Sequence, residues 1–151
     1  MPPKSAAHRH RRWLVAHRKR RQLARRLVGV SQQASYVDGL WDGRPVRDWV
    51  PEVVEDVVAA FDPVRVILFG SVARAEEGPG SDLDLLVLFD DVGVEDRRSL
   101  MGRIRGAIRA PIPIDVLVAT VSEFEALKDV NGSPYYWPAR EGRVAHERPA
   151  A

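Results

Sequence analysis

Three short apolar runs constrain the fold of this chain more than any other feature. They are "VRVILF" (residues 64–69), "DLDLLVLF" (82–89) and "IPIDVLV" (112–118), each rich in Val, Ile and Leu. Runs of this length and composition predict buried β-strands. Segments with helical spacing lie between and around them, so the sequence predicts an α/β (α+β) domain in which helices pack against a small sheet.

The helices are predicted from spacing and from their end signals. Apolar residues recur at i, i+3, i+4 and i+7 over residues 46–61, which predicts an amphipathic helix capped by Asp48. A second helix is expected to stop before Pro111, and the Ser-x-x-Glu capping box at Ser122 predicts a third. After a further short helix, residues 143–146 are expected to form an edge strand.

The charge of the chain is divided unevenly along its length. The net charge is only +2, yet residues 1–29 hold ten Lys or Arg and no acid, which leaves 13 Lys or Arg against 21 Asp or Glu afterwards. This segment, the basic arm, is expected to be a helix or disordered, with apolar residues at loosely helical spacing. Two interpretations stay open: a solvated extension, or attachment to nucleic acid or an acidic partner through residues 4–26. Those apolar residues are Trp13, Leu14, Leu23, Leu27 and Val28.

Composition sets the domain boundaries and excludes several classes of protein. Residues 31–45 are rich in turn formers and are expected to be a linker or irregular, which divides the chain into residues 1–45 and a domain over 46–151. Without cysteine there is no disulfide, iron–sulfur cluster or thiolate zinc site. No apolar run approaches 18 residues and no apolar segment follows the N-terminal basic residues, so we expect a cytoplasmic protein without a membrane span or signal peptide.

Three aspartates are the strongest candidates for chemistry. Asp82 and Asp84 are two residues apart on a predicted strand, so they project on the same side, and Asp115 interrupts the third apolar run. Neighbouring carboxylates repel unless a cation lies between them, and Mg²⁺ prefers hard oxygen ligands together with substrate phosphates. If the two strands are adjacent, the three acids form the ligand set of a two-metal phosphoryl or nucleotidyl transfer site.

Gly70 and Ser71 lie where the first predicted strand turns directly into a short helical turn. A glycine lets the backbone approach a ligand closely, the serine hydroxyl adds a donor, and backbone N–H groups at a helix start attract phosphate. These two residues are therefore candidate phosphate ligands.

The stretch "GSVARAEEGPGSDLDLLV" (residues 70–87) resembles the signature of the minimal nucleotidyltransferases of the DNA polymerase β superfamily, which is Gly-Ser, ten residues and Asp-x-Asp. The resemblance covers roughly residues 46–147. It implies a nucleotidyltransferase fold with a small mixed sheet and ATP as substrate. By the same resemblance Gly70 and Ser71 hold the triphosphate, Asp82 and Asp84 ligate two Mg²⁺ ions, and Asp115 completes the metal site and activates the acceptor hydroxyl.

Three further positions of this stretch are compared with the family pattern. Arg74 matches the family pattern, either as a phosphate or partner contact or in a salt bridge with nearby acids. Ser81 is a candidate nucleotide contact, with capping of the strand entry as its alternative. Ala75 departs from the family, which commonly has glycine there, so the turn after the short helix is expected to differ.

The resemblance also suggests a reaction. Many small stand-alone domains of this kind are antitoxins encoded beside an all-helical HEPN ribonuclease toxin, and they transfer AMP from ATP to a tyrosine of that toxin. With only 36 residues after Asp115, the acceptor side of the site is expected to be open. The first hypothesis is therefore a protein adenylyltransferase with a co-encoded HEPN-type partner. The alternatives are an antitoxin that acts by binding alone, and transfer to a small hydroxylated molecule such as an aminoglycoside.

Overall fold

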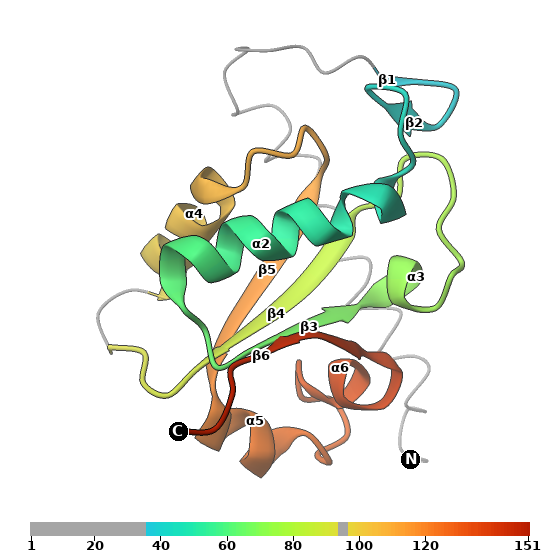
Figure 1. Cartoon of the computed structure of the whole chain (residues 1–151). Helices are drawn as coiled ribbons and strands as arrows, with labels where there is room; N and C mark the ends of the chain where they lie inside the picture. Colours follow the sequence, from blue (N-terminus) through green and yellow to red (C-terminus); the bar gives the residue numbers. More distant parts are fainter. Residues whose placement is uncertain (1–35, 94–96) are drawn as a thin grey trace, which may run out of the picture.

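A four-stranded mixed sheet forms the centre of the protein (Figure 1). The structure is a computed structural model and describes residues 36–93 and 97–151, so the basic arm and the first turn of the second predicted helix lie outside the described residues. The strand order is β5-β4-β3-β6, in which β4 and β5 are parallel and the other neighbours antiparallel. This confirms the predicted mixed sheet. Its strands are β3 (Arg65–Phe69), β4 (Leu83–Phe89), β5 (Ile114–Thr120) and β6 (Arg143–Glu147).

Helices cover both faces of the sheet. In Figure 1, α2 and α4 cross one face, whereas α5 and α6 lie against the other. The single turn α3 follows β3 at one end of the sheet. The bounds are α2 Val50–Phe61, α3 Gly70–Ala73, α4 Arg97–Ala107, α5 Val121–Leu127 and α6 Tyr136–Glu141.

The two faces of β4 belong to two separate cores, because successive side chains of a strand point to opposite faces. Leu83, Leu85 and Val87 pack with residues of α2 and α4. Leu86 and Leu88 pack with Phe124 of α5 and Tyr135 on the other face. Burial of β4 on both faces explains why its sequence is an almost continuous apolar run.

The first predicted helix begins differently from the expectation. A 3-10 turn, η1 (Val46–Trp49), precedes α2, and Asp48 lies inside that turn and does not cap the helix. Pro51 lies at the start of α2, where a proline removes no helical hydrogen bond.

A hairpin occupies part of the segment that we expected to be irregular. β1 (Tyr36–Val37) and β2 (Leu40–Trp41) pair across Asp38 and Gly39, and both of these residues have positive φ. A second Asp-Gly pair, Asp42-Gly43, then brings Trp41 and Arg44 together as an isolated bridge. An Asp-Gly pair between apolar residues is a strong hairpin signal, and the composition-based prediction overlooked it.

The capping box at the start of α5 also lies elsewhere than predicted. The Thr120 hydroxyl accepts a hydrogen bond from the Glu123 backbone N–H at 3.1 Å, and the Glu123 carboxylate accepts one from the Thr120 N–H at 3.0 Å. The prediction had placed the box two residues later, at Ser122. Because β5 continues to Thr120, its last residue serves as the cap.

None of the helices in the part of the chain that the structure describes is long and apolar enough to cross a membrane.

Candidate active site

The candidate site residues meet at one end of the sheet. Because β3 is antiparallel to β4, and β5 is parallel to β4, the C-terminal end of β3 lies beside the N-terminal ends of β4 and β5. Gly70 and Ser71 follow β3, Asp82 and Asp84 lie at the start of β4, and Asp115 lies at the start of β5. Three segments distant in the sequence thus contribute to one end of the sheet.

Asp84 and Asp115 are direct neighbours across the parallel pair. Ile114 and Val116 pack on the α2 and α4 side, as Leu83 and Leu85 do, so the alternation directs both aspartates to the opposite face. Asp82, one residue before β4, shares the side of Asp84 by the same two-residue period. Asp82 and Asp84 are buried, with 9% and 8% exposure, whereas 21% of the Asp115 side chain is exposed.

Gly70 is required where β3 ends. Its φ of +76° lies in the left-handed region, and a Cβ at this position would lie 2.2 Å from the Asp84 Oδ2 atom. The sequence suggested that Gly70 leaves room for a phosphate. In the structure, the group that lies closest to Gly70 is the carboxylate of Asp84. Any larger residue at position 70 would displace the central acid of the site.

The segment between Ser71 and Asp82 is fixed by local hydrogen bonds. The Ser71 carbonyl accepts a bond from the Glu76 N–H at 2.9 Å, and the Ser81 hydroxyl accepts one from the Gly78 N–H at 2.9 Å. Ser81 thus stabilises its own turn. The helix α3 is a single turn of four residues, which is too short to supply the helix dipole that the sequence suggested.

Arg74 is held by two carboxylates. Its guanidinium donates to Glu76 at 2.9 Å and to Glu141, at the end of α6, at 3.1 Å. The hydrogen bond to Glu76 is the largest cause that raises the pKa of Arg74. The salt bridge with Glu76 was among the sequence alternatives, but Glu141 was missed because nothing in the sequence indicates that α6 packs against α3. Ala75, the departure from the family pattern, has a φ of +56°.

Two other charged residues near the site were not predicted. The guanidinium of Arg105, on α4, lies 3.7 Å from the Asp115 carboxylate. Arg47 of η1 forms an ion pair with Glu77, whose side chain is only 8% exposed, and this pair fastens the segment before Asp82 to η1. Arg105 lies ten residues before Asp115 in a helix with several arginines, so nothing in the sequence distinguishes it from its neighbours.

The carboxylates fit a divalent cation that receives part of its ligand shell from substrate. Among the residues that the structure describes, no three His, Asp or Glu side chains are grouped so as to hold a metal ion. Mg²⁺ does not need such a cage, because it is commonly bound by one or two carboxylates, substrate phosphates and water. Asp84 and Asp115, in register on adjacent strands, supply two hard oxygen ligands on one face.

A family comparison agrees with this arrangement. The family model for the nucleotidyltransferase domain matches residues 50–141, more than half of the chain. The chain belongs to this nucleotidyltransferase family. The match spans α2 to α6 and contains all the candidate site residues of this nucleotidyltransferase. Members of the family use a nucleoside triphosphate and a divalent metal.

A solved structure supports the fold of the nucleotidyltransferase. The crystal structure of a candidate nucleotidyltransferase from Sulfolobus solfataricus is similar with a TM-score of 0.50 and 22% sequence identity, covering 68% of this chain and 81% of that one. At this identity the similarity supports the fold and not a substrate. None of the curated proteins compared with the chain matches it.

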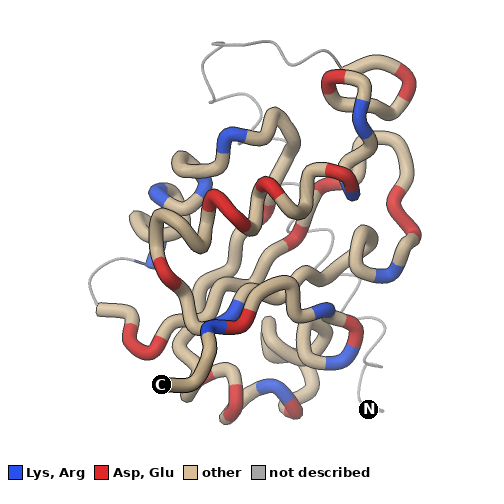
Figure 2. Tube along the Cα trace, viewed as in Figure 1, with Lys and Arg blue, Asp and Glu red and all other residues tan. Residues whose placement is uncertain are grey.

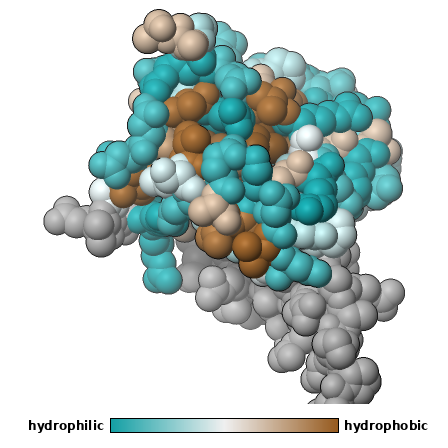
Figure 3. All heavy atoms as spheres, turned by 90° about the horizontal axis from the view of Figure 1, so that it is seen from below, coloured by the Kyte–Doolittle hydropathy of each residue, from teal (hydrophilic) through white to brown (hydrophobic). Residues whose placement is uncertain are grey.

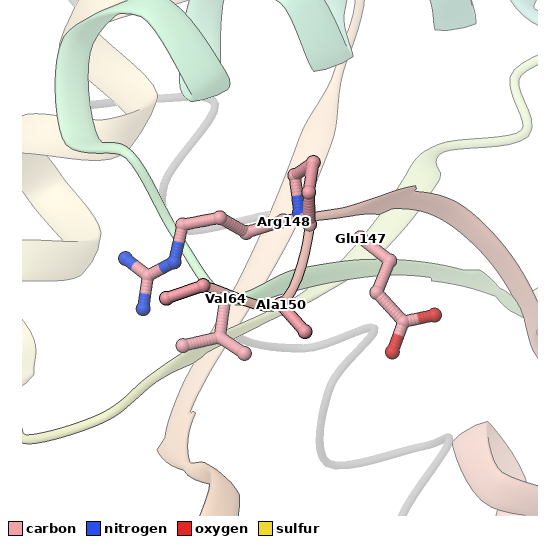
Figure 4. Close-up of a pocket in the computed structure, with 6 residues that line it drawn as sticks. Val64, Glu147, Arg148 and Ala150 are labelled. Atoms are coloured by element: carbon pink, nitrogen blue, oxygen red, sulfur yellow. The ribbon is translucent and has the colours of Figure 1, made fainter.

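A pocket in the structure lies away from these acids. It is bordered by Val64 and by the last residues of the chain, and Figure 4 shows the Arg148 and Glu147 side chains pointing away from each other there. Val64 precedes β3, so the pocket is at the opposite end of this strand from Gly70. The pocket therefore has no part in the candidate active site.

The aromatic segment 135–137 lies partly in the core. Tyr135 is buried and meets Phe124 edge-to-face, with ring centroids 6.3 Å apart. The Arg140 guanidinium lies over the Tyr136 ring at 3.7 Å. These contacts favour packing over base stacking, the two interpretations that this segment allows.

Proposed function

We propose that this nucleotidyltransferase transfers AMP from ATP to a tyrosine hydroxyl of a partner protein, as the antitoxin of a HEPN-type toxin. The observation that carries nucleotidyl transfer is the placement of Asp84 and Asp115 in register beside Gly70. ATP, Mg²⁺ and the protein acceptor are supported by the resemblance of residues 70–87 to the minimal nucleotidyltransferases.

The proposed reaction is a single displacement at phosphorus. The acceptor oxygen forms a bond to the α-phosphorus of ATP, the bond from that phosphorus to the bridging β-oxygen breaks, and pyrophosphate leaves. The Asp115 carboxylate, which is partly exposed, accepts the hydroxyl proton. Gly70 and Ser71 would hold the phosphates, and Asp82 and Asp84, with Asp115 completing the site, would hold Mg²⁺. When bound, Mg²⁺ supplies positive charge that neutralises the phosphates.

The surroundings of the site suit a large acceptor. Among the described residues, the site end of the sheet is bordered by α3 and by the segments 74–82 and 108–113. The segment 74–82 is mostly exposed, and it is anchored by Arg47 and Arg74. A tyrosine presented by a loop or tail of another protein can approach such an end.

Labelled ATP tests this proposal directly. The full chain is incubated with Mg²⁺, the protein encoded beside it and ATP labelled at either the α- or the γ-phosphate. We expect the α-label on the partner and no γ-label, because AMP transfer retains only the α-phosphate. Asp84→Asn is expected to remove at least 99% of the label, on the order of the effect of losing a catalytic group, whereas Asp48→Asn, an exposed acid of η1, retains it.

The other outcomes identify the alternatives. If the unaltered chain binds and silences its partner without transferring label, the binding-only antitoxin is correct. If label appears only on an added aminoglycoside, the acceptor is a small molecule. Transfer of the γ-label would contradict nucleotidyl transfer itself.

A further inference from the structure

Three apolar side chains of the hairpin are exposed. Tyr36, Val37 and Leu40 are 40%, 60% and 37% exposed, although each is large and apolar. Tyr36 lies opposite Trp41, with tilted rings whose centroids are 4.7 Å apart, whereas Val37 lies opposite Leu40, so Val37 and Leu40 share the other face of the hairpin. Strands of two residues cannot bury such side chains on their own. We call Val37 and Leu40, with the turn acids Asp38 and Asp42, the hairpin patch.

The surroundings of the hairpin patch are acidic. Figure 2 shows acidic positions on both turns of the hairpin and along the neighbouring η1 and α2. Asp48 and Glu55 are exposed there, and the Arg44 guanidinium is bound to Glu52 at 2.6 Å. Across residues 36–151, ten of the 13 Lys and Arg residues already take part in ion pairs with acids of the same domain. A partner of this patch must therefore combine apolar and basic residues.

The basic arm of this chain has that composition. Residues 1–29 contain ten basic residues, no acid and the apolar residues Trp13, Leu14, Leu23, Leu27 and Val28. Only residues 30–35 separate the arm from Tyr36, and six residues extend to at most about 20 Å. A segment held this close has an effective concentration on the order of millimolar at the hairpin patch.

We propose that residues 13–28 of the basic arm dock on the hairpin patch of the same molecule. The apolar side chains of the arm cover Val37 and Leu40, and its arginines lie against Asp38, Asp42 and the acids of η1 and α2. The occupant is thus a segment of this chain, selected by charge complementarity and by its direct connection to the hairpin.

A second exposed apolar group offers no such argument. Leu127, Val130 and Val144 are exposed in α5, the turn after it and β6. Figure 3, which views the molecule from below, shows apolar areas separated by hydrophilic side chains. Its neighbours carry both signs of charge, and nothing identifies what would cover it.

Disulfide capture tests the docking cleanly, because the chain has no cysteine of its own. The full chain with Leu27→Cys and Leu40→Cys is oxidised under mild conditions and examined on a non-reducing gel. We expect an internally linked monomer whose yield is independent of protein concentration. The yield should fall several-fold between 0.1 and 1 M salt, because the screening length drops from about 10 Å to about 3 Å.

Matched variants separate docking from chance collision. The first variant carries the same cysteine pair together with Asp38→Asn and Asp42→Asn. Asparagine tolerates the positive φ of both turns, so only the charges are lost, and the yield of linked monomer should be several-fold lower. Pairing Leu27→Cys with Val144→Cys, on the far edge strand, should give little product. Equal yields in all three proteins would overturn the proposal, and disulfide-linked dimers as the main product would show that the arm binds a second copy.

Hydrogen exchange gives a test that leaves the hairpin unaltered. Replacing Arg18, Lys19, Arg20 and Arg21 together by glutamine should speed amide exchange at residues 36–41 several-fold in the full chain. Unchanged exchange there, with the core equally protected, would contradict docking even if the cysteine variants failed to fold.

Discussion

Gly70 and Ala75 show how single backbone positions limit the site. Both residues have positive φ, at +76° and +56°, and they flank the one-turn helix α3. Glycine adopts this conformation freely, whereas an L-residue in it is strained by about 1–2 kcal/mol. Position 70 carries the glycine that its backbone conformation favours, whereas position 75 carries an alanine in a conformation that favours glycine.

Ala75→Gly is therefore expected to stabilise the protein. Relief of the strained φ exceeds the entropy that glycine loses on folding, which leaves a gain of about 0.5–1 kcal/mol in the free energy of unfolding. Urea denaturation measures this gain. The matched control is Ala59→Gly on the exposed side of α2, which should lose about 1 kcal/mol. Destabilisation by both substitutions would show that Ala75 is not strained.

The sequence predicted helices and strands correctly where the hydrophobic periodicity was strong. It did not predict the residues at which elements end or the contacts between distant elements. The runs 64–69, 82–89 and 112–118 became β3, β4 and β5 within two residues, because burial enforces their composition. The cap of α5 was missed because it depends on where β5 stops, whereas the hairpin was missed because the Asp-Gly signal of its turn was overlooked. The three acids could be selected from the sequence, but their register required the parallel pairing of β4 with β5.

The cap of α5 gives a prediction at this scale. Thr120→Ala removes the hydroxyl that accepts the Glu123 N–H and should cost about 1 kcal/mol in the free energy of unfolding. Ser122→Ala, at the position that the sequence favoured, should change it by less than about 0.5 kcal/mol. Thermal and urea unfolding of the two variants compares them, and a larger loss for Ser122→Ala would contradict the observed capping box.

A second prediction concerns the joint between α2 and the segment after α4. Asp56, which is buried, accepts hydrogen bonds from the Arg109 guanidinium at 2.7 and 3.0 Å and from its backbone N–H at 2.9 Å. The side-chain bonds are the largest cause that lowers the pKa of Asp56 below its ordinary value of 3.8. Because Arg109 is largely exposed, we expect Asp56→Asn to cost only about 1–2 kcal/mol at pH 7.

The pH dependence of this loss follows from the direction of the pKa shift. A lowered pKa stabilises the folded state fully above the unfolded value of 3.8, and the stabilisation disappears as the pH falls through the folded pKa. The difference between the unaltered chain and Asp56→Asn should thus be constant above about pH 5 and shrink below pH 4. Glu55→Gln, an exposed acid of the same helix, serves as control, and a difference that is as large at pH 2.5 as at pH 7 would contradict the assignment.

At the scale of the whole molecule, charge divides the chain into two parts. The excess of acids over bases after residue 29 is eight, while the basic arm carries ten positive charges. Every described strand and every candidate site residue lies at or after Tyr36. The described cores and the candidate site are therefore formed by residues after the arm.

A chain that begins at residue 30 should consequently fold and still bind nucleotide. Its urea midpoint should lie close to that of the full chain, because both hydrophobic cores remain and only the contacts of the docked arm with the hairpin are lost. Any affinity of the full chain for nucleic acid should be lost with the arm, and in the full chain it should weaken steeply with salt. Sequence-specific binding that resists salt would show that the arm has a more specific task.

Asp115 has a consequence that concerns solubility. It lies on β5, which is an outer strand of the sheet among the strands described and is otherwise apolar from Ile114 to Ala119. Exposed apolar edge strands invite intermolecular pairing, and a charge within such a strand opposes it. The Asp115 carboxylate thus opposes aggregation through this edge. Asp115→Val is therefore expected to lower the solubility of the protein for a reason unrelated to catalysis, whereas Asp115→Asn keeps a polar group at the edge.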